Sequence, residues 1–113
     1  MLDVLHTLVS EVNTRGHIST FLKGVNISTK ISNQEDVIYL IIEDGQIKLD
    51  SISNTDIIAT ILGDKHSIYS LITGKLRLRD GKKEGVLEVE ANFRTILYLE
   101  TLFILSKPYL QVS

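Results

Sequence analysis

The sequence contains no cysteine and a single proline among its 113 residues. The absence of cysteine excludes a disulfide framework, a cysteine-ligated zinc site and a thiol nucleophile, and it fits the reducing cytoplasm, where we expect the protein to reside. With 43% hydrophobic and 23% charged residues, the chain has the composition of an ordinary globular protein and not that of a disordered or collagen-like segment. At this length we expect a single domain, residues 1–113, with one core.

An excess of positive charge is also lacking. Twelve Lys and Arg residues stand against fourteen Asp and Glu residues, so the formal net charge is -2. No general positive field is available to hold a polyanion, and we therefore expect no nucleic-acid partner. Long apolar runs are missing too: the densest, residues 96–105, is about half of what spans a bilayer and contains Glu100. The N-terminal segment has no basic leader, so we expect no signal peptide.

The first half of the chain changes from a helical to a strand periodicity. Apolar residues at helical spacing predict a helix over 2–14, ended by Gly16, and a short helical turn over 18–23, ended by Gly24. From residue 25 onward apolar and polar residues alternate, which is typical of strands with one face in water. The predicted strands cover 25–32, 36–43 and 46–50, the last two joined by an Asp44-Gly45 turn.

The second half adds two strands and two helices. The charged stretch 75–85 is predicted to be a surface loop with room for one helical turn, and the final helix is predicted over 93–106, because the residue before Pro108 disfavours helical conformation. The other predicted elements are a strand over 55–62, a helix over 65–73 with Asp64 as its N-cap, and a strand over 86–91. This order predicts an α+β fold: a five-stranded, mostly antiparallel sheet with helices packed on one face.

Three stretches resemble the sterol carrier protein type-2 domain family. They are the strand and turn YLIIEDG (39–45), the strand DIIATIL (56–62) and the helix end with its glycine-lysine step, LITGKL (71–76), and their order and spacing are similar to the family's. The resemblance implies a sterol carrier protein-like fold that holds a lipid in a hydrophobic tunnel between sheet and helices. The segment 86–92 departs from the family because it is acidic and lacks a glycine, so we expect the mouth of a cavity to differ.

The predicted final helix has more apolar surface than one face of a sheet can cover, since its apolar residues surround nearly the whole helix. Either a second helix or a partner subunit covers the surplus, or part of it lines a lipid tunnel, as the resemblance implies. Each candidate lining residue also fits ordinary core packing. The candidates are Ile68, Leu71, Ile72, Leu76, Leu87, Val89, Ala91, Leu99, Leu102 and Phe103.

Two features bear on partners. The strands over 36–43 and 55–62 are apolar on both faces, so either the protein covers their back face or a second copy does; we favour a homodimer. A cluster of basic residues forms either a solvated loop or a foothold for transient contact with an anionic membrane surface or a lipid carboxylate. The cluster consists of Lys75, Arg77, Arg79, Lys82 and Lys83, diluted by Asp80 and Glu84.

Signals for catalysis are weak. His6, His17 and His66 share no metal-ligand spacing, and the sequence has no nucleophile elbow, phosphate-binding loop or dinucleotide-binding glycine pattern. We therefore expect no enzyme, no metal and no cofactor, and a hydrolase or transferase is the least favoured class. Two hypotheses remain: a domain that binds or transfers acyl, sterol-like or isoprenoid lipids, and a non-catalytic dimerisation, scaffold or accessory domain in lipid or quinone metabolism.

Overall fold

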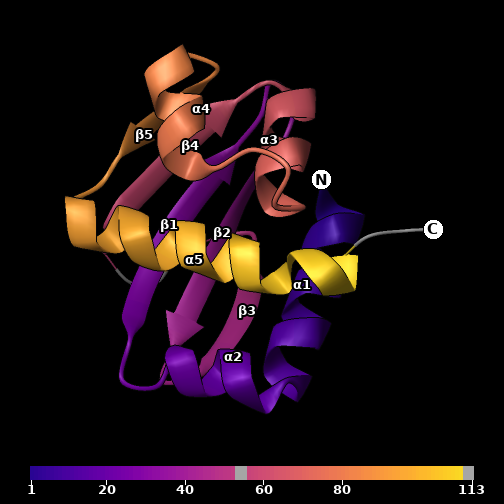
Figure 1. Ribbon diagram of the computed structural model, residues 1–113. Coiled ribbons are helices and arrows are strands. Elements are labelled where there is room, and N and C mark those ends of the chain that lie inside the picture. The colour runs from indigo at the N-terminus through magenta and orange to yellow at the C-terminus, as the bar shows by residue number, and fades with distance from the viewer. Residues whose placement is uncertain (53–55, 111–113) are drawn as a thin grey trace.

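The computed structural model describes residues 1–52 and 56–110 of the chain. Figure 1 shows an α+β arrangement, as the sequence predicts. The elements, in chain order, are α1 (Leu2–Thr14), α2 (Gly16–Phe21), β1 (Asn26–Ser32), β2 (Val37–Glu43), β3 (Gln46–Asp50), β4 (Ala59–Gly63), α3 (Lys65–Ile72), α4 (Leu78–Glu84), β5 (Leu87–Glu90) and α5 (Phe93–Leu110).

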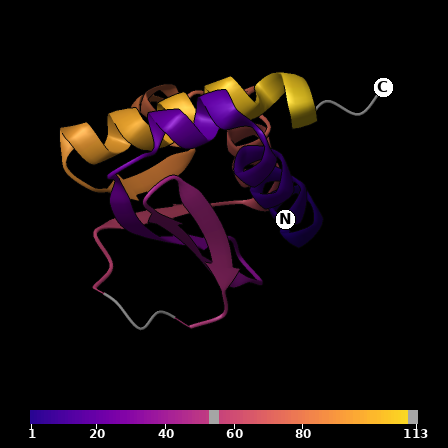
Figure 2. The ribbon, with the colours of Figure 1, turned by 90° about the horizontal axis from the view of Figure 1, so that it is seen from below.

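The strands form one sheet in the order β3-β2-β1-β4-β5. Neighbouring strands are antiparallel except β1 and β4, which run parallel. The helices gather on one side of this sheet, with α5 lying across it, as Figures 1 and 2 show from two directions. The predicted fold class is therefore confirmed.

The core lies between this sheet and the helices. Alternate residues of a strand point to the same face, and the residues that point toward the helices are apolar with one exception, a threonine. The helices bury their own apolar stripes against the same layer, so sheet and helices share one core. The inward residues of β1, β2 and β4 are Ile27, Thr29, Ile31, Ile38, Leu40, Ile42, Ala59 and Ile61, all of them buried.

Residues 56–58, directly before β4, lie at the far face of the sheet, the face that no helix covers in Figure 2. The Ile58 N–H donates to the Ser28 carbonyl at 3.0 Å. Ile41, on the far face of β2, lies next to Ile58 and is only 6% exposed. Ile58 thus covers part of the far face of the sheet.

The predicted strand over 55–62 begins too early. β4 begins at Ala59, because residues 56–58 are irregular and only Ala59 comes level with its partner Thr29. Residue 55 lies outside the described residues. Ile57 and Ile58 are apolar, like strand residues, but they lie before the strand and each is about half exposed.

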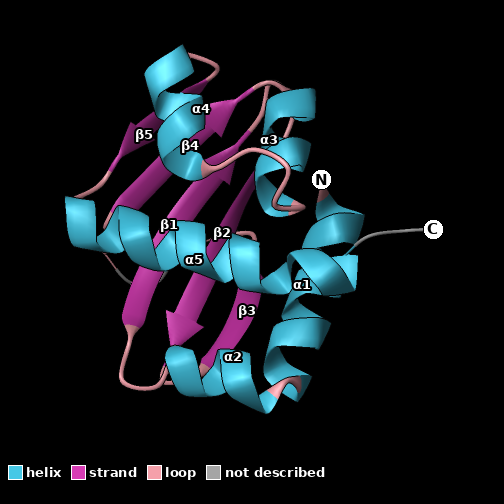
Figure 3. Ribbon diagram, viewed as in Figure 1, coloured by secondary structure: helices cyan, strands magenta, loops and turns pink. Residues whose placement is uncertain are grey.

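The predicted first helix, over 2–14, is confirmed by α1, but Gly16 is not the residue that ends it. Arg15 takes an extended conformation (φ -102°, ψ 107°) that turns the chain, so α1 ends at Thr14 and Gly16 begins α2. The predicted loop over 75–85 is also partly wrong, because residues 78–84 form α4, which Figure 3 shows as a separate helix. This helix is stabilised by the burial of Leu78 and ends at Gly85, which has a positive φ of 79°.

The last helix runs through Pro108 and not only to residue 106, which corrects the prediction. Proline removes one helical hydrogen bond and crowds the carbonyl four residues earlier. The final turn nevertheless packs against the first two helices: Leu110 is buried, and the Arg15 guanidinium lies 3.8 Å from the centre of the Tyr109 ring. These contacts outweigh the penalty at Pro108.

Asn13, near the end of α1, joins this helix to the edge strand β3. Its Nδ2 donates to the Ile47 carbonyl at 2.9 Å, and its Oδ1 accepts from the Ile47 N–H at 2.8 Å. Because β3 is an edge strand, the backbone groups of Ile47 that point away from β2 have no strand partner. The asparagine amide takes the place of such a partner.

We expect Asn13→Ala to lower the free energy of unfolding by about 1–3 kcal/mol, since it removes two hydrogen bonds that each contribute roughly 0.5–1.5 kcal/mol. Urea denaturation followed by circular dichroism measures this change, and Asn26→Ala, at an exposed asparagine, is the control. An Asn13→Ala protein as stable as the wild type would contradict the role given to this amide.

Candidate functional site

The surface of α5 is only partly covered by the rest of the chain. Leu99, Leu102 and Phe103 point into the core and are fully or almost fully buried. Phe93 and Ile104 are exposed, at 63% and 36%. The apolar surplus that the sequence predicts is therefore present, and helix α2 covers a share of it.

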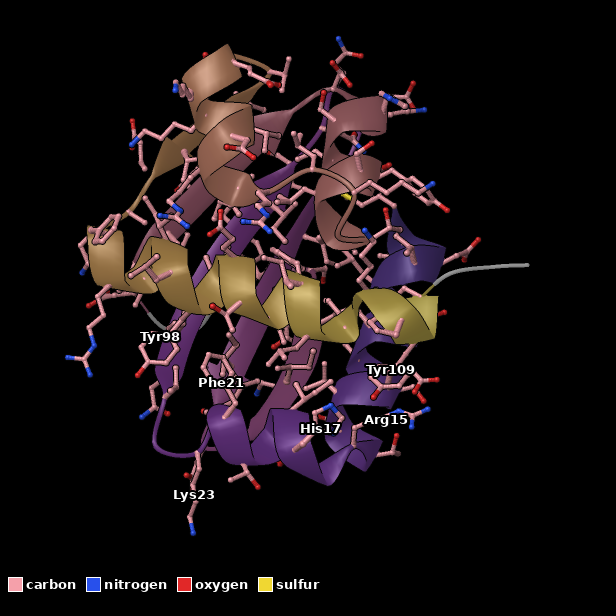
Figure 4. All side chains as sticks on the ribbon, viewed as in Figure 1. Arg15, His17, Phe21, Lys23, Tyr98 and Tyr109 are labelled. Atoms are coloured by element: carbon pink, nitrogen blue, oxygen red, sulfur yellow. The ribbon has the colours of Figure 1, made fainter. Side chains whose placement is uncertain are left out.

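The contact between α2 and α5 is aromatic. The rings of Phe21 and Tyr98 lie 5.5 Å apart between their centres, in a tilted arrangement. Figure 4 shows these two side chains between the helices, with Arg15, His17 and Tyr109 gathered farther along the same seam. Aromatic pairs of this geometry combine a large apolar area with a defined orientation.

Two adjoining hollows open beside this aromatic pair, and together we name them the α5 groove. The outer hollow has a volume of about 260 Å³ and the inner one about 210 Å³. Both are lined by Arg94 and Tyr98, which makes them neighbours. The outer hollow is also lined by Phe21, Leu97 and Thr101, and the inner one by Gly24, Val25, Asn26, Ile27, Ile58, Asn92 and Thr95.

The groove is open to solvent and touches the core at its floor. Ile27 and Thr95, which line the inner hollow, are each 5% exposed, whereas most of the other residues that line it are exposed: Gly24, Asn26, Ile58, Asn92 and Arg94. Leu97 and Tyr98 are partly exposed. Ile27 is an inward-facing residue of β1, so the inner hollow touches the edge of the layer between α5 and the sheet.

The rim of the groove is cationic. The Arg94 guanidinium lies 5.9 Å from the centre of the Tyr98 ring, a distance at which a cation is attracted to an aromatic face. Lys23, at the end of α2, is exposed nearby, as Figure 4 shows. A third hollow, of about 300 Å³, lies beyond Asn26 on the far face and is bordered by the carboxylates of Glu43 and Asp56.

A buried carboxylate joins α5 to α4. Glu100 is only 4% exposed, and its carboxylate accepts hydrogen bonds from the Arg79 Nε at 2.9 Å and the Arg79 backbone N–H at 3.1 Å. Burial by itself would raise the pKa of Glu100, but the hydrogen bonds and charge of Arg79, with a smaller effect from Arg77, leave this pKa below its ordinary value of 4.5. The ion pair fixes α4 against the last helix.

Two members of the basic cluster already have partners within the chain. Arg79 is engaged with Glu100, and Lys75 lies 5.8 Å from the centre of the Tyr69 ring. Arg77, Lys82 and Lys83 are exposed. The predicted contact with an anionic membrane surface through this cluster stays a prediction.

The ten lining residues predicted from the sequence lie in the core or against it, and none of them lines the three hollows above. Leu76 and Ala91 are partly buried. The role of all ten residues in a tunnel stays a prediction. The buried residues among them are Ile68, Leu71, Ile72, Leu87, Val89, Leu99, Leu102 and Phe103.

Sequence reasoning did not single out Phe21, Arg94 or Thr101. Leu97 and Tyr98 belong to the apolar residues that surround the last helix, and this pattern is the sequence feature that points to them. Phe21 belongs to a helix of six residues and meets Tyr98 only through the tertiary fold.

Two classes of site are not found among residues 1–52 and 56–110. No three His, Cys, Asp or Glu side chains there are grouped so that they could hold a metal ion. No helix in the same ranges has both the length and the apolarity needed to cross a membrane.

Neither a protein-family model nor a curated protein matches this sequence. Solved structures do. The UbiJ-SCP2 ubiquinone synthesis protein matches with a TM-score of 0.68 at 14% identity, over 88% of this chain and 84% of that one. The sterol carrier protein domain 2 of Helicoverpa armigera matches with a TM-score of 0.67 at 15% identity, over 94% and 85%. The sec-alkylsulfatase Pisa1 from Pseudomonas sp. matches with a TM-score of 0.64 at 15% identity, over 74% of this chain and only 14% of the sulfatase.

The chain therefore has the fold of the sterol carrier protein 2 domains, and the resemblance drawn from the sequence is confirmed at this level. The match covers most of the solved chain named for ubiquinone synthesis but only a small part of the much larger sulfatase chain.

The Glu100–Arg79 pair makes stability depend on pH. Because the pKa of Glu100 is lower in the folded than in the unfolded state, its contribution is complete above 4.5 and is lost as the pH falls through the lowered folded-state value. We expect Glu100→Gln to be less stable than the wild type at neutral pH, and to lose less stability than the wild type between neutral pH and pH about 3.

Urea denaturation at both pH values measures this difference. Glu88→Gln, at an exposed carboxylate of β5, is the matched control and should keep the pH dependence of the wild type. If Glu100→Gln and the wild type lost equal stability in acid, the buried pair would not be the source of the effect.

Proposed function

We propose that this protein binds a lipid with a long apolar chain between α5 and the sheet, without covalent chemistry, and transfers it. The observation that carries the proposal is the α5 groove: its outer hollow is lined by the aromatic pair Phe21 and Tyr98, and its inner hollow by Tyr98 and by Ile27 on the inner face of β1. A hydrocarbon chain that passes this pair meets the apolar core. The fold shared with sterol carrier protein 2 domains supports the same interpretation.

The ten predicted residues are the proposed lining of the bound state. They lie in the core or against it, so the hydrocarbon chain of the lipid reaches them only when α5 moves away from the sheet. The helix is held in place mainly by apolar contacts with α1 and α2, and by the ion pair of Glu100 with Arg79. Apolar contacts are not directional, and a hydrocarbon chain can replace them.

The energetics favour permissive binding. Roughly fifteen buried methylenes at ~0.8 kcal/mol each contribute about 12 kcal/mol, against an association cost of about 4–15 kcal/mol. At the low end of this cost about 8 kcal/mol remain, which corresponds to a micromolar affinity. Burial of methylenes hardly distinguishes one hydrocarbon from another, so acyl, sterol-like and isoprenoid chains all fit this site.

A second candidate function is an accessory role in quinone or lipid metabolism. The observation that favours it is the structural match to a domain named for ubiquinone synthesis. In this role the α5 groove would hold an isoprenoid chain while a partner enzyme modifies its head. Purification from the native host with associated proteins and lipids distinguishes the two functions, because a carrier retains lipid alone.

Binding can be tested with a pyrene-labelled long-chain alcohol and the corresponding fatty acid. We expect fluorescence titration to show saturable binding to the wild type. Leu97→Asp should weaken it by about tenfold or more, because a carboxylate in the groove has to be desolvated beside the hydrocarbon chain.

Ile104→Asp is the matched control. It makes the same change at an exposed apolar residue of the same helix that lines none of the three hollows, and should bind as the wild type does. A wild type that binds neither probe, or equal binding by both variants, would contradict the proposed site.

The proposed homodimer would use the far face of the sheet. Val37 and Leu62 both flank Ser32 on neighbouring strands and are 48% and 40% exposed. We expect light scattering to give twice the chain mass of 12.7 kDa, and Leu62→Lys to shift the protein toward the monomer. A wild type that is monomeric at every concentration would contradict the dimer.

A further inference from the structure

Thr29 is the polar residue on the inner face of the central strand. It lies in the middle of β1, with Leu40 of β2 on one side and Ala59 of β4 on the other. Its exposed fraction is 0%, and its alternation with Ile27 and Ile31 places its side chain toward the helices. Among the buried side-chain nitrogen and oxygen atoms of the described residues, Thr29 Oγ1 alone has no hydrogen-bond partner.

No side chain or backbone group in the described part of the chain bonds this hydroxyl. Buried polar groups are nearly always hydrogen-bonded, because a desolvated group without a partner destabilises the folded state. Valine has the same branched shape and at least the same preference for strands, and it would fill this position without that penalty. The hydroxyl therefore indicates a partner that is absent from the chain itself.

Thr29 lies next to the inner end of the α5 groove. Ile27 lines the inner hollow, and Thr29 is the following inward-facing residue on the same strand. Two residues along a strand span about 6.6 Å, roughly the length of five carbon–carbon bonds in an extended chain. A ligand that passes Ile27 reaches the Thr29 hydroxyl within a short distance.

We propose that Thr29 Oγ1 hydrogen-bonds the polar end of the bound lipid, so that the ligand enters with this end first and leaves its apolar chain toward the groove. This inference rests on the proposed lipid-binding function and specifies the class of ligand. The polar end is neutral, an alcohol or a carbonyl, because an ionised carboxylate buried against one neutral hydroxyl would be strongly disfavoured. The site thus discriminates against pure hydrocarbons, which cannot form this bond, and against fatty acid anions.

The test compares decan-1-ol with decane in NMR titrations of the wild type, Thr29→Val and Thr29→Ser. We expect the wild type and Thr29→Ser to bind the alcohol more tightly than the hydrocarbon, and Thr29→Val to lose about five- to tenfold in affinity for the alcohol alone, the size expected for one buried hydrogen bond. Thr60→Val, the same change at a half-buried position of β4 that faces away from the helices, should bind as the wild type does.

Stability separates a binding role from a structural one. Without ligand, Thr29→Val is expected to have a higher unfolding midpoint than the wild type, since it removes a desolvated hydroxyl. A lower midpoint would mean that the hydroxyl serves the fold and would overturn the inference. Equal affinity of Thr29→Val and the wild type for decan-1-ol would also overturn it and leave the proposed function standing. If the wild type bound neither compound, both proposals would fail.

Discussion

The covering of one sheet face by α5 is the interaction on which the rest of the structure depends. The sheet has an apolar inner face formed by alternate residues of each strand, and α5 lies across it with Leu99, Leu102 and Phe103 turned inward. The other helices pack around α5: α1 against its side, α2 through the Phe21 and Tyr98 rings, and α4 through the Glu100–Arg79 pair. Because an apolar contact has no preferred direction, the same arrangement that stabilises the fold also permits a hydrocarbon to compete for the surface of α5.

Two kinds of contact hold α5, and they differ in how they respond to a guest molecule. The pair of Glu100 with Arg79 is directional and fixes one side of the helix against α4. On the side of α2 the contact is made by the Phe21 and Tyr98 rings, and there the groove opens. In the proposed function, a ligand on that side displaces aromatic and aliphatic contacts, while the polar pair still joins α5 to α4.

Much of the fold is predictable from local pattern, and most of the site is not. The helix over 2–14, the strand over 46–50 and the Asp44-Gly45 turn follow from periodicity and turn chemistry, which act over a few residues. The start of β4 depends on its pairing with β1, and the passage of α5 through Pro108 depends on tertiary packing; no local pattern contains either. Phe21 and Tyr98 lie far apart in the sequence, so their contact depends on the whole fold. The ten residues predicted to line a tunnel share only their apolarity, and apolarity does not distinguish a core residue from a ligand contact.

The two edges of the sheet bear on how the protein behaves in a crowded solution. Asn13 occupies the outward backbone groups of Ile47 on one edge, and the other edge, β5, has only four residues, of which Glu88 and Glu90 are charged. Short, charged or occupied edges resist the addition of a further strand, which is the usual route by which β-proteins aggregate. Neither edge of the sheet therefore offers a ready template for fibril growth.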